Sequence, residues 1–268
     1  MFRKAITAAA LALALPGAAF AAGAGGEVTD KEFSFEGPFG SFDRLQLQRG
    51  FQVYQNVCAG CHGMKYVSFR SLGEAGGPEF PEEQVRAIAA QYEVIDKATG
   101  EYREAKPSDN FPANEAVGAP DLSLMAKARA GFHGPYGLGI SQFVNGMGGP
   151  EYIYSLLTGY NGEEKEQAGT FLYGNDVYPG GYISMSQPLW GDDVEYESFG
   201  EGSGYTPPEA TLEQQSEDVA AFLMWAAEPK LVERKEAGVR NVLMLAVLAV
   251  LLYFTNKQIW AAVKGKEH

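Results

Sequence analysis

The sequence is poor in cysteine and histidine, with 2 cysteines and 3 histidines in 268 residues. Both cysteines, Cys58 and Cys61, lie in one short motif, so no disulfide framework is available to the rest of the chain. A zinc site on this motif would need a fourth ligand beyond His62, and the other histidines are His133 and His268. The composition therefore excludes a disulfide-rich fold and disfavours zinc.

Basic residues are also few, since 21 Lys and Arg stand against 34 Asp and Glu, for a formal net charge of −13 at pH 7. This charge would repel the phosphates of a nucleic acid, so we expect no nucleic-acid binding. It favours a basic partner, although a surface that is only solubilising is the alternative. The sequence shows no internal repeat, no phosphate-binding glycine motif and no Ser-His-Asp arrangement.

Long apolar runs occur only near the two ends of the chain. At the start, Arg3 and Lys4 precede an apolar run over 5–15, and small residues follow it. This layout is typical of a secretory signal peptide, which we predict over residues 1–21. A membrane anchor there is disfavoured because the run is short and Pro16 interrupts it.

The C-terminal apolar run, Val242 to Phe254, is shorter than the roughly 20 residues that a bilayer core requires. The flanking residues extend this run to a length that can span a bilayer. Arg240 can reach the membrane surface with its charged end, and Trp260 suits the interface. The sequence therefore predicts one transmembrane helix over 237–260.

The signal peptide sets the orientation of that helix. We expect a periplasmic domain over 22–229, a juxtamembrane segment over 230–236 and a cytoplasmic tail over 261–268 in a bacterial cytoplasmic (inner) membrane.

Cys58 and Cys61 are separated by two residues and followed directly by His62. This is the pattern by which a c-type haem is attached, because two thiols at that spacing can add to two vinyl groups of a porphyrin. The adjacent histidine is then held under the iron. A thioredoxin-like redox pair is the alternative, but it does not require the histidine. The motif, with an export signal upstream, predicts one covalently bound haem c.

The spacing of apolar residues predicts a mainly α-helical domain with long loops. The first helix puts Cys58 on its apolar face, in line with Leu47, Phe51 and Tyr54. The segments 96–119 and 169–181 are rich in turn residues and are predicted as loops. The predicted soluble helices cover 42–57, 81–92, 121–129 with Asp121 as its cap, 151–158, and 211–228 with Thr211 and Gln214 as a capping box.

The second axial ligand decides the chemistry of such a site, because a thioether closes the iron for electron transfer whereas an open position invites ligand binding. Of the 7 methionines, position in the chain leaves Met125, Met147 and Met185. We favour Met185, which lies far from His62 in a loop before Pro188. His133 is the rival ligand.

With these segments located, the chain resembles the cytochrome c1 family, the c-haem subunit of the quinol:cytochrome c oxidoreductase (bc1) complex, most closely its alphaproteobacterial members. The resemblance covers about residues 33–264. It is carried by the runs FSFEG at 33–37, RGFQVY at 49–54, CAGCHGMK at 58–65, APDLS at 119–123, AKAR at 126–129, YIYSLLTGY at 152–160 and FLMWAAEPK at 222–230.

The resemblance implies a class I cytochrome c-like haem domain on a single C-terminal transmembrane helix. Met185 would be the second iron ligand beside His62, Arg129 would pair with a haem propionate, and Pro120 would belong to the cofactor-binding residues. Two departures stand out. Ser186 and Gln187 stand where the family often has prolines, and the extra cysteine pair of many bacterial members is missing.

The function implied by the resemblance is one-electron relay from the Rieske iron–sulfur protein to a cytochrome c, within a dimeric complex that contains cytochrome b. The chemistry on quinol is not expected in this chain, which would itself be non-catalytic. A basic cytochrome could be steered by two acidic clusters, Glu163, Glu164 and Glu166, and Asp192, Asp193, Glu195, Glu197 and Glu201. The alternatives are a free-standing membrane-anchored carrier, a haem-based sensor and a thiol oxidoreductase.

Overall fold

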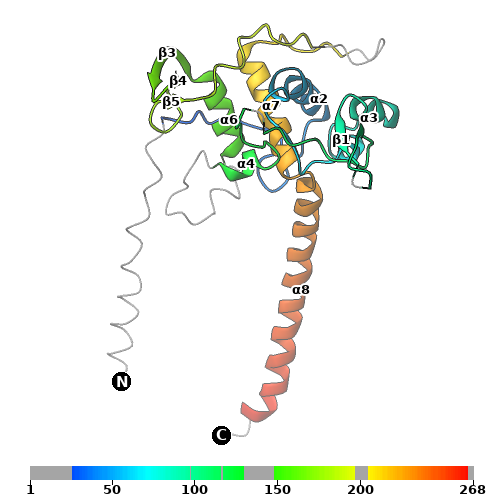
Figure 1. Ribbon diagram of the computed structural model, residues 1–268. Helices are drawn as coiled ribbons and strands as arrows, with labels where there is room; N and C mark the ends of the chain where they lie inside the picture. The colour runs from blue at the N-terminus through cyan, green and yellow to red at the C-terminus, as the bar shows by residue number, and fades with distance from the viewer. Residues whose placement is uncertain (1–25, 97, 116, 130–147, 197–204, 265–268) are drawn as a thin grey trace.

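A computed structural model describes residues 26–96, 98–115, 117–129, 148–196 and 205–264 (Figure 1). A mostly helical head stands on one long helix, α8, that leaves it from below (Figure 1). The mainly α-helical class predicted from the sequence is confirmed. The predicted signal peptide over 1–21 lies outside the described residues.

The head is organised around the crossing of α2 (Arg44–Val53) with α7 (Leu212–Ala227). The crossing is close because Gly50 lies at the contact. A Cβ added there would lie 2.0 Å from the carbonyl oxygen of Asp218 and 2.7 Å from the Cβ of Phe222. The glycine thus lets two helices far apart in sequence meet backbone to backbone.

The first helix is longer than α2, because a π-helical segment, Tyr54–Cys58, continues it. The predicted face is confirmed, since Leu47, Phe51 and Tyr54 are all at most 3% exposed. Around this face gathers a cluster of aromatic rings. Its edge-to-face and tilted contacts join Phe51, Tyr54, Phe69, Phe80, Tyr92, Phe111, Phe222 and Trp225.

Of the two predicted helix caps, Thr211 is observed at its predicted position and Asp121 is not. Thr211 caps α7, its hydroxyl accepting from the backbone N–H of Gln214, but the Gln214 side chain donates forward to Asp218 instead of reaching back. The prediction for Asp121 was wrong, because α4 is only Met125–Ala128 with Leu124 at its N-cap. The carboxylate of Asp121 instead accepts hydrogen bonds from the backbone N–H groups of Lys65 and Ser123.

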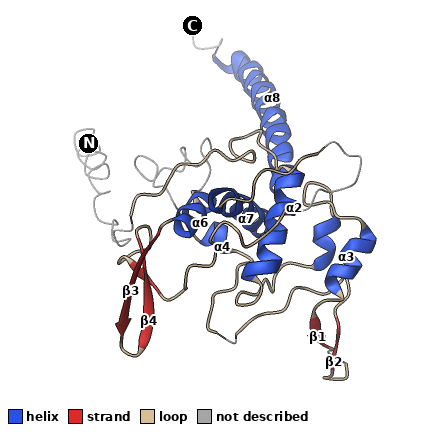
Figure 2. Cartoon of the chain, turned by 90° about the horizontal axis from the view of Figure 1, so that it is seen from above, coloured by secondary structure: helices blue, strands red, loops and turns tan. Residues whose placement is uncertain are grey.

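The remaining helices flank this crossing (Figure 2). Helix α6 packs on α7, and α4 contacts both α6 and α7. The predicted end of α6 at Gly159 is confirmed. The bounds are Phe69–Gly73 for a 3-10 helix, Glu82–Ala89 for α3 and Gly149–Thr158 for α6.

Strands occur in both segments that were predicted as loops, so those predictions were wrong. The antiparallel strands β3 and β4 are joined through Ala168 and Gly169, whose φ angles of 53° and 78° suit the tight turn of a two-residue hairpin. Their mostly exposed polar residues lack the alternation by which a half-buried strand is predicted. The strands are Glu93–Ile95 (β1), Tyr102–Glu104 (β2), Tyr160–Gln167 (β3), Thr170–Asn175 (β4) and Tyr182–Ile183 (β5).

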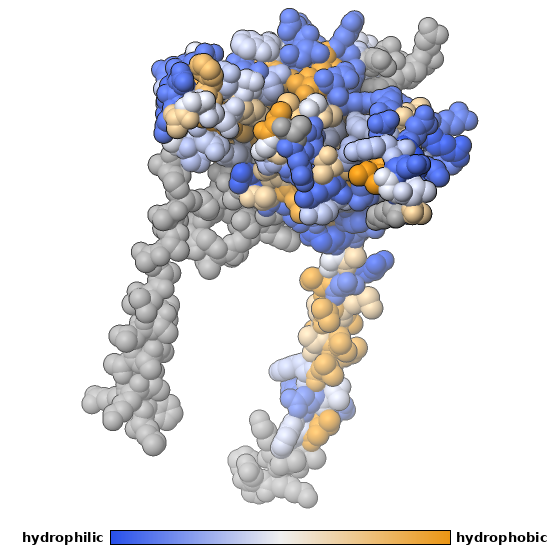
Figure 3. All heavy atoms as spheres, in the orientation of Figure 1, coloured by the Kyte–Doolittle hydropathy of each residue, from blue (hydrophilic) through white to orange (hydrophobic). Residues whose placement is uncertain are grey.

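Helix α8 covers Leu231–Lys264 and contains the whole predicted span. Its stretch Leu231–Ala261 has a mean hydropathy of 2.0 and is long enough to cross a membrane. Apolar side chains surround the middle of this helix, whereas the head is largely polar (Figure 3). Because no part of the described head covers these side chains, a bilayer is their natural environment.

Candidate haem site

The Cys-x-x-Cys-His motif begins where the first helix ends. The backbone N–H of His62 donates to the carbonyl of Cys58 at 2.8 Å, which folds the motif into a turn. Cys58 packs half-buried against the core, whereas Cys61 is exposed. The two thiols are therefore presented from one short turn, as attachment to one edge of a porphyrin requires.

His62 is oriented by a main-chain oxygen. Its Nδ1 lies 2.7 Å from the carbonyl oxygen of Pro120. Because a carbonyl only accepts hydrogen bonds, Nδ1 carries a proton, so in the neutral imidazole the lone pair is on Nε2. This is the state that an axial ligand needs, and hydrogen bonding at the other nitrogen fixes the ring and raises its basicity. The residues at this side fit a haem.

Pro120 reaches His62 because the segment 120–123 is held along the residues that follow the motif. Asp121 accepts from the backbone N–H of Lys65 at 2.9 Å, and Leu122 donates its N–H to the carbonyl of Gly63 at 2.9 Å. The Pro120 oxygen is therefore held in place by the residues that directly follow His62. Sequence analysis named Pro120 only through the family resemblance, since a main-chain acceptor has no signature of its own.

Met185 lies in a loop after β5 and is packed, half-buried, against the core. The hydroxyl of Tyr160 donates to its carbonyl oxygen at 3.0 Å, which ties the loop to the start of β3. Among the other candidates, Met125 also packs against the core, while Met147 and the rival ligand His133 lie outside the described residues. A half-buried methionine in a tethered loop fits the predicted role of Met185 as an iron ligand.

Arg129 follows α4 and is exposed. Among the residues that the structure describes, no carboxylate forms an ion pair with it. Burial raises the pKa of the Tyr152 hydroxyl, and the nearby charge of Arg129 opposes that rise. A guanidinium without a described carboxylate partner fits the predicted role beside a propionate.

The surroundings of Cys58 do not favour it as the nucleophile of a redox dithiol. Burial raises the pKa of the Cys58 thiol to about 12, with a smaller contribution from Cys61. A reactive dithiol requires a lowered pKa, because the thiolate is the nucleophile.

The described part of the chain contains no group of three or more His, Cys, Asp and Glu side chains that could hold a metal ion.

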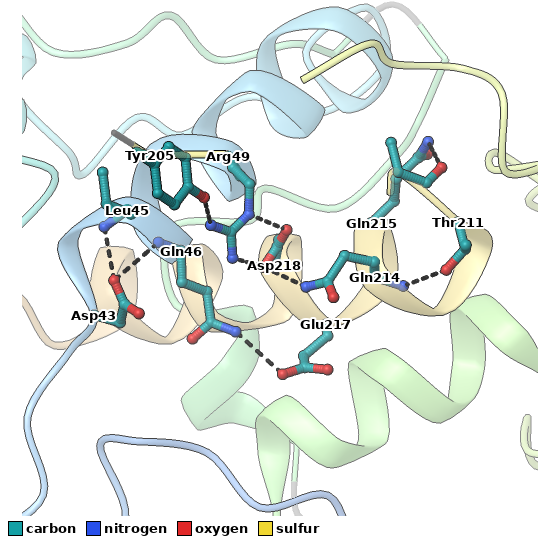
Figure 4. A network of polar contacts seen from close by, with 11 residues as sticks. Asp43, Leu45, Gln46, Arg49, Tyr205, Thr211, Gln214, Gln215, Glu217 and Asp218 are labelled. Atoms are coloured by element: carbon teal, nitrogen blue, oxygen red, sulfur yellow. Dashed lines mark hydrogen bonds and ion pairs between the residues drawn. The ribbon is translucent and has the colours of Figure 1, made fainter. Parts of the chain in front are cut away.

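A buried polar network joins the helix that carries the motif to α7 (Figure 4). Arg49 donates to both carboxylate oxygens of Asp218, at 2.7 and 2.9 Å, and also to the hydroxyl of Tyr205. Gln214 donates to the same carboxylate at 3.0 Å. Burial raises the pKa of Asp218, and Arg49 opposes that rise. The bidentate pair fixes α2 against α7 at a position that lies before the motif on the same helix.

The acidic clusters lie mostly on the surface. Glu163, Glu164 and Glu166 are exposed on β3, and Glu163 accepts from the Tyr182 hydroxyl. Asp193 instead closes a local turn by accepting from the backbone N–H of Trp190 and Gly191. Asp192 and Glu195 are exposed, whereas Glu197 and Glu201 lie outside the described residues.

Comparison with known proteins now adds to this geometry. Residues 33–263 match the cytochrome C1 family. The chain belongs to the cytochrome c1 family. It is 54% identical to cytochrome c1 of Cereibacter sphaeroides over 100% of this chain and 99% of that protein. It is 46% identical to cytochrome c1 of Rhodobacter capsulatus over 98% of this chain and 99% of that protein.

A third relative, "Cytochrome b/c1" of Bradyrhizobium diazoefficiens, is 39% identical over 96% of this chain and 40% of that longer protein. As a cytochrome c1 family member, the chain carries one covalently bound c-type haem and is the haem-bearing electron-transfer subunit of a bc1 complex, anchored in a membrane. The Cys-x-x-Cys-His motif fits that cofactor.

Proposed function

We propose that this chain receives one electron from the Rieske iron–sulfur protein and passes it to a cytochrome c on the periplasmic side. The proposal rests on membership of the cytochrome c1 family. Cytochrome b would be its second partner, in keeping with the fused name of the Bradyrhizobium relative, and the complex would be dimeric. A bound c-type haem supplies a single reversible electron at the iron.

The chain's own residues would hold that group from two sides. Cys58 and Cys61 would form the thioether bonds, and the Nε2 lone pair of His62 would bind the iron. The observation that carries this assignment is the hydrogen bond from His62 Nδ1 to the Pro120 carbonyl, which leaves that lone pair free. Met185 would close the other side with its thioether, and Arg129 would neutralise a propionate.

The domain order proposed from the sequence gives this site its compartment. Residues 1–21 would be removed after export, 22–229 would form the periplasmic domain, 230–236 the juxtamembrane segment, 237–260 the span and 261–268 the cytoplasmic tail. Because α8 begins at Leu231, the proposed juxtamembrane segment would be the first turns of the anchoring helix. A protease added to intact spheroplasts should then cleave the head and leave the C-terminal tail protected.

The exposed glutamates of β3 would steer a basic cytochrome c. Replacing Glu164 and Glu166 with Gln should slow electron transfer to the acceptor about two- to fivefold at low ionic strength, because long-range attraction raises association rates. The matched control is Glu82→Gln with Glu83→Gln on α3, which removes the same charge elsewhere on the surface. Equal rates in both double variants, or rates of the parent protein that do not depend on salt, would remove this docking site.

Purification tests the proposed function as a whole. The native membranes are extracted with a mild detergent, the complex is isolated through this chain, and the product is assayed for b-type haem and quinol-dependent reduction of cytochrome c. We expect b haem, an iron–sulfur protein and activity to co-purify. A chain that emerges alone, with c haem only, would instead be a free-standing anchored carrier.

A further inference from the structure

The turn formed by Gly37, Pro38, Phe39 and Gly40 presents one aromatic side chain to solvent. Phe39 is 82% exposed, more than any other large hydrophobic side chain that the structure describes. Gly37 has a φ of 64°, which favours glycine, and the ring of Pro38 fixes that residue's own φ. The turn thus has a defined conformation with Phe39 at its tip, and the electron-transfer site leaves this aromatic residue unexplained.

The turn is held from within by its flanking residues. The ring of Phe35 stacks on that of Phe33 with centroids 5.0 Å apart, and packs on that of Phe42 at 4.9 Å. The backbone N–H of Ser41 donates to the carbonyl of Ser34 at 3.0 Å, which closes the loop. The exposure of Phe39 is therefore a property of an ordered loop whose other phenylalanines are packed.

Helix α8 binds the same loop. Lys235, in the second turn of that helix, donates its Nζ to the carbonyl oxygens of Phe35 at 2.5 Å and Gly40 at 3.3 Å. In Figure 1 the loop lies on the underside of the head, beside the start of α8. Two elements 200 positions apart in sequence therefore meet at the base of the membrane helix.

The position of Lys235 sets the height of the turn relative to a bilayer. It precedes by four residues Val239, the first exposed large apolar residue of α8. At 1.5 Å per residue, this is a rise of about 6 Å. The headgroup region adds about 5–8 Å to each side of the hydrocarbon core. The loop therefore lies at the height of the headgroups if α8 spans the membrane.

We propose that Phe39 is a second membrane contact, inserted into the lipid headgroup region beside α8. An apolar ring such as that of phenylalanine can be buried at the boundary between headgroups and acyl chains, as it is on helices that lie in the membrane interface. A protein partner would be expected to cover a contiguous group of large apolar side chains, whereas the neighbouring Ser34 and Ser41 are polar and exposed. Together with α8, this contact would restrict how the head tilts on its single anchor.

A spin label measures the depth directly. In the haem-loaded full-length chain both native cysteines are used in thioether bonds, so Phe39→Cys supplies the only free thiol. The labelled chain is placed in vesicles of phosphatidylcholine and phosphatidylglycerol, and collisions of the nitroxide with oxygen and with a water-soluble nickel chelate are compared. Phe171→Cys on β4, 61% exposed and distant from α8 in Figure 1, is the matched aqueous control. Val242→Cys in the span is the membrane control.

We expect the ratio of oxygen to chelate collisions at position 39 to exceed that at position 171 severalfold and to fall below that at position 242. A ratio equal to that at position 171 would place Phe39 in water and overturn the proposal. Shielding from both reagents would overturn it as well, because protein would then cover this position. Neither result depends on electron transfer, so the proposal can fail while the proposed function stands.

Discussion

The side of the site that carries His62 and the side that carries Met185 are held by different kinds of contact. His62 follows a helix locked to α7 by a buried bidentate ion pair, and its ring is fixed by Pro120. Met185 lies in a loop whose described side-chain tether is one hydrogen bond from Tyr160. The proposed ligand His62 is therefore positioned by the core of the fold and the proposed ligand Met185 by a surface hairpin, so damage to the two sides should have different consequences.

The largest expected effect is on the His62 side. Asp218→Ala would leave the Arg49 guanidinium buried without its partner, and we expect the free energy of unfolding to fall by about 3–5 kcal/mol. Urea unfolding of the haem-loaded chain in detergent measures this loss. The control is Glu82→Ala, which breaks an exposed ion pair with Arg86 and should cost less than about 1 kcal/mol. Similar losses of unfolding free energy in the two variants would show that the buried pair contributes no more to stability than an exposed one.

A second effect depends on pH and concerns α6, which leads into Tyr160 on the Met185 side. Glu151 is 1% exposed, and burial, followed by its hydrogen bond with Glu36 and repulsion from Glu36 and Asp30, raises its pKa to about 8. The folded chain thus holds a proton that the unfolded chain, with a pKa near 4.5, has released. The resulting stability is fully present below about pH 4.5 and is lost as pH rises through about 8.

Glu151→Gln should abolish this pH dependence. Across pH 5–8, the parent chain should lose about 1 kcal/mol of stability per pH unit relative to the variant. Unfolding midpoints at several pH values in that window measure the difference, and Glu164→Gln, an exposed control, should follow the parent chain. Parallel pH profiles of the parent and Glu151→Gln would mean that the buried carboxyl group is ionised in the folded chain.

The smallest effect is expected at the tether of Met185. Tyr160→Phe removes the hydroxyl that donates to the Met185 carbonyl and should cost about 0.5–1.5 kcal/mol. The loss loosens the loop that carries Met185 but leaves the His62 side intact. Met185 should then leave the iron more readily, so carbon monoxide should bind the reduced haem of this variant faster. Tyr182→Phe removes a hydroxyl that donates to Glu163 instead and should leave the rate unchanged. Equal acceleration in both variants would argue against a specific tether.

Sequence reasoning succeeded where the contacts are local. The apolar spacing of Leu47, Phe51 and Tyr54 predicted the face on which Cys58 meets the core, because helical periodicity acts within a few turns. The Thr211 cap and the stop at Gly159 are equally local.

Contacts between distant parts of the chain could not be predicted from helical periodicity or local caps. The ion pair between Arg49 and Asp218 spans 169 positions, and the acceptor for His62 is a main-chain oxygen that any residue could supply. The hairpin of β3 and β4 was missed because its polar surface lacks alternation and its turn is Ala168-Gly169 rather than Asn-Gly. Met185 was favoured from its position in the chain and then supported by the family resemblance, whereas Arg129 was named as a site residue by the resemblance alone.

The most direct test of the account is carbon monoxide binding to the reduced, haem-loaded chain with and without Met185. If His62 and Met185 hold the iron from opposite sides, the parent chain should resist carbon monoxide, whereas Met185→Leu should bind it stoichiometrically, since leucine offers no ligand atom. A variant that resists as the parent does would assign the second ligand to another residue. A parent chain that binds carbon monoxide as readily as the variant would contradict a closed, six-coordinate iron.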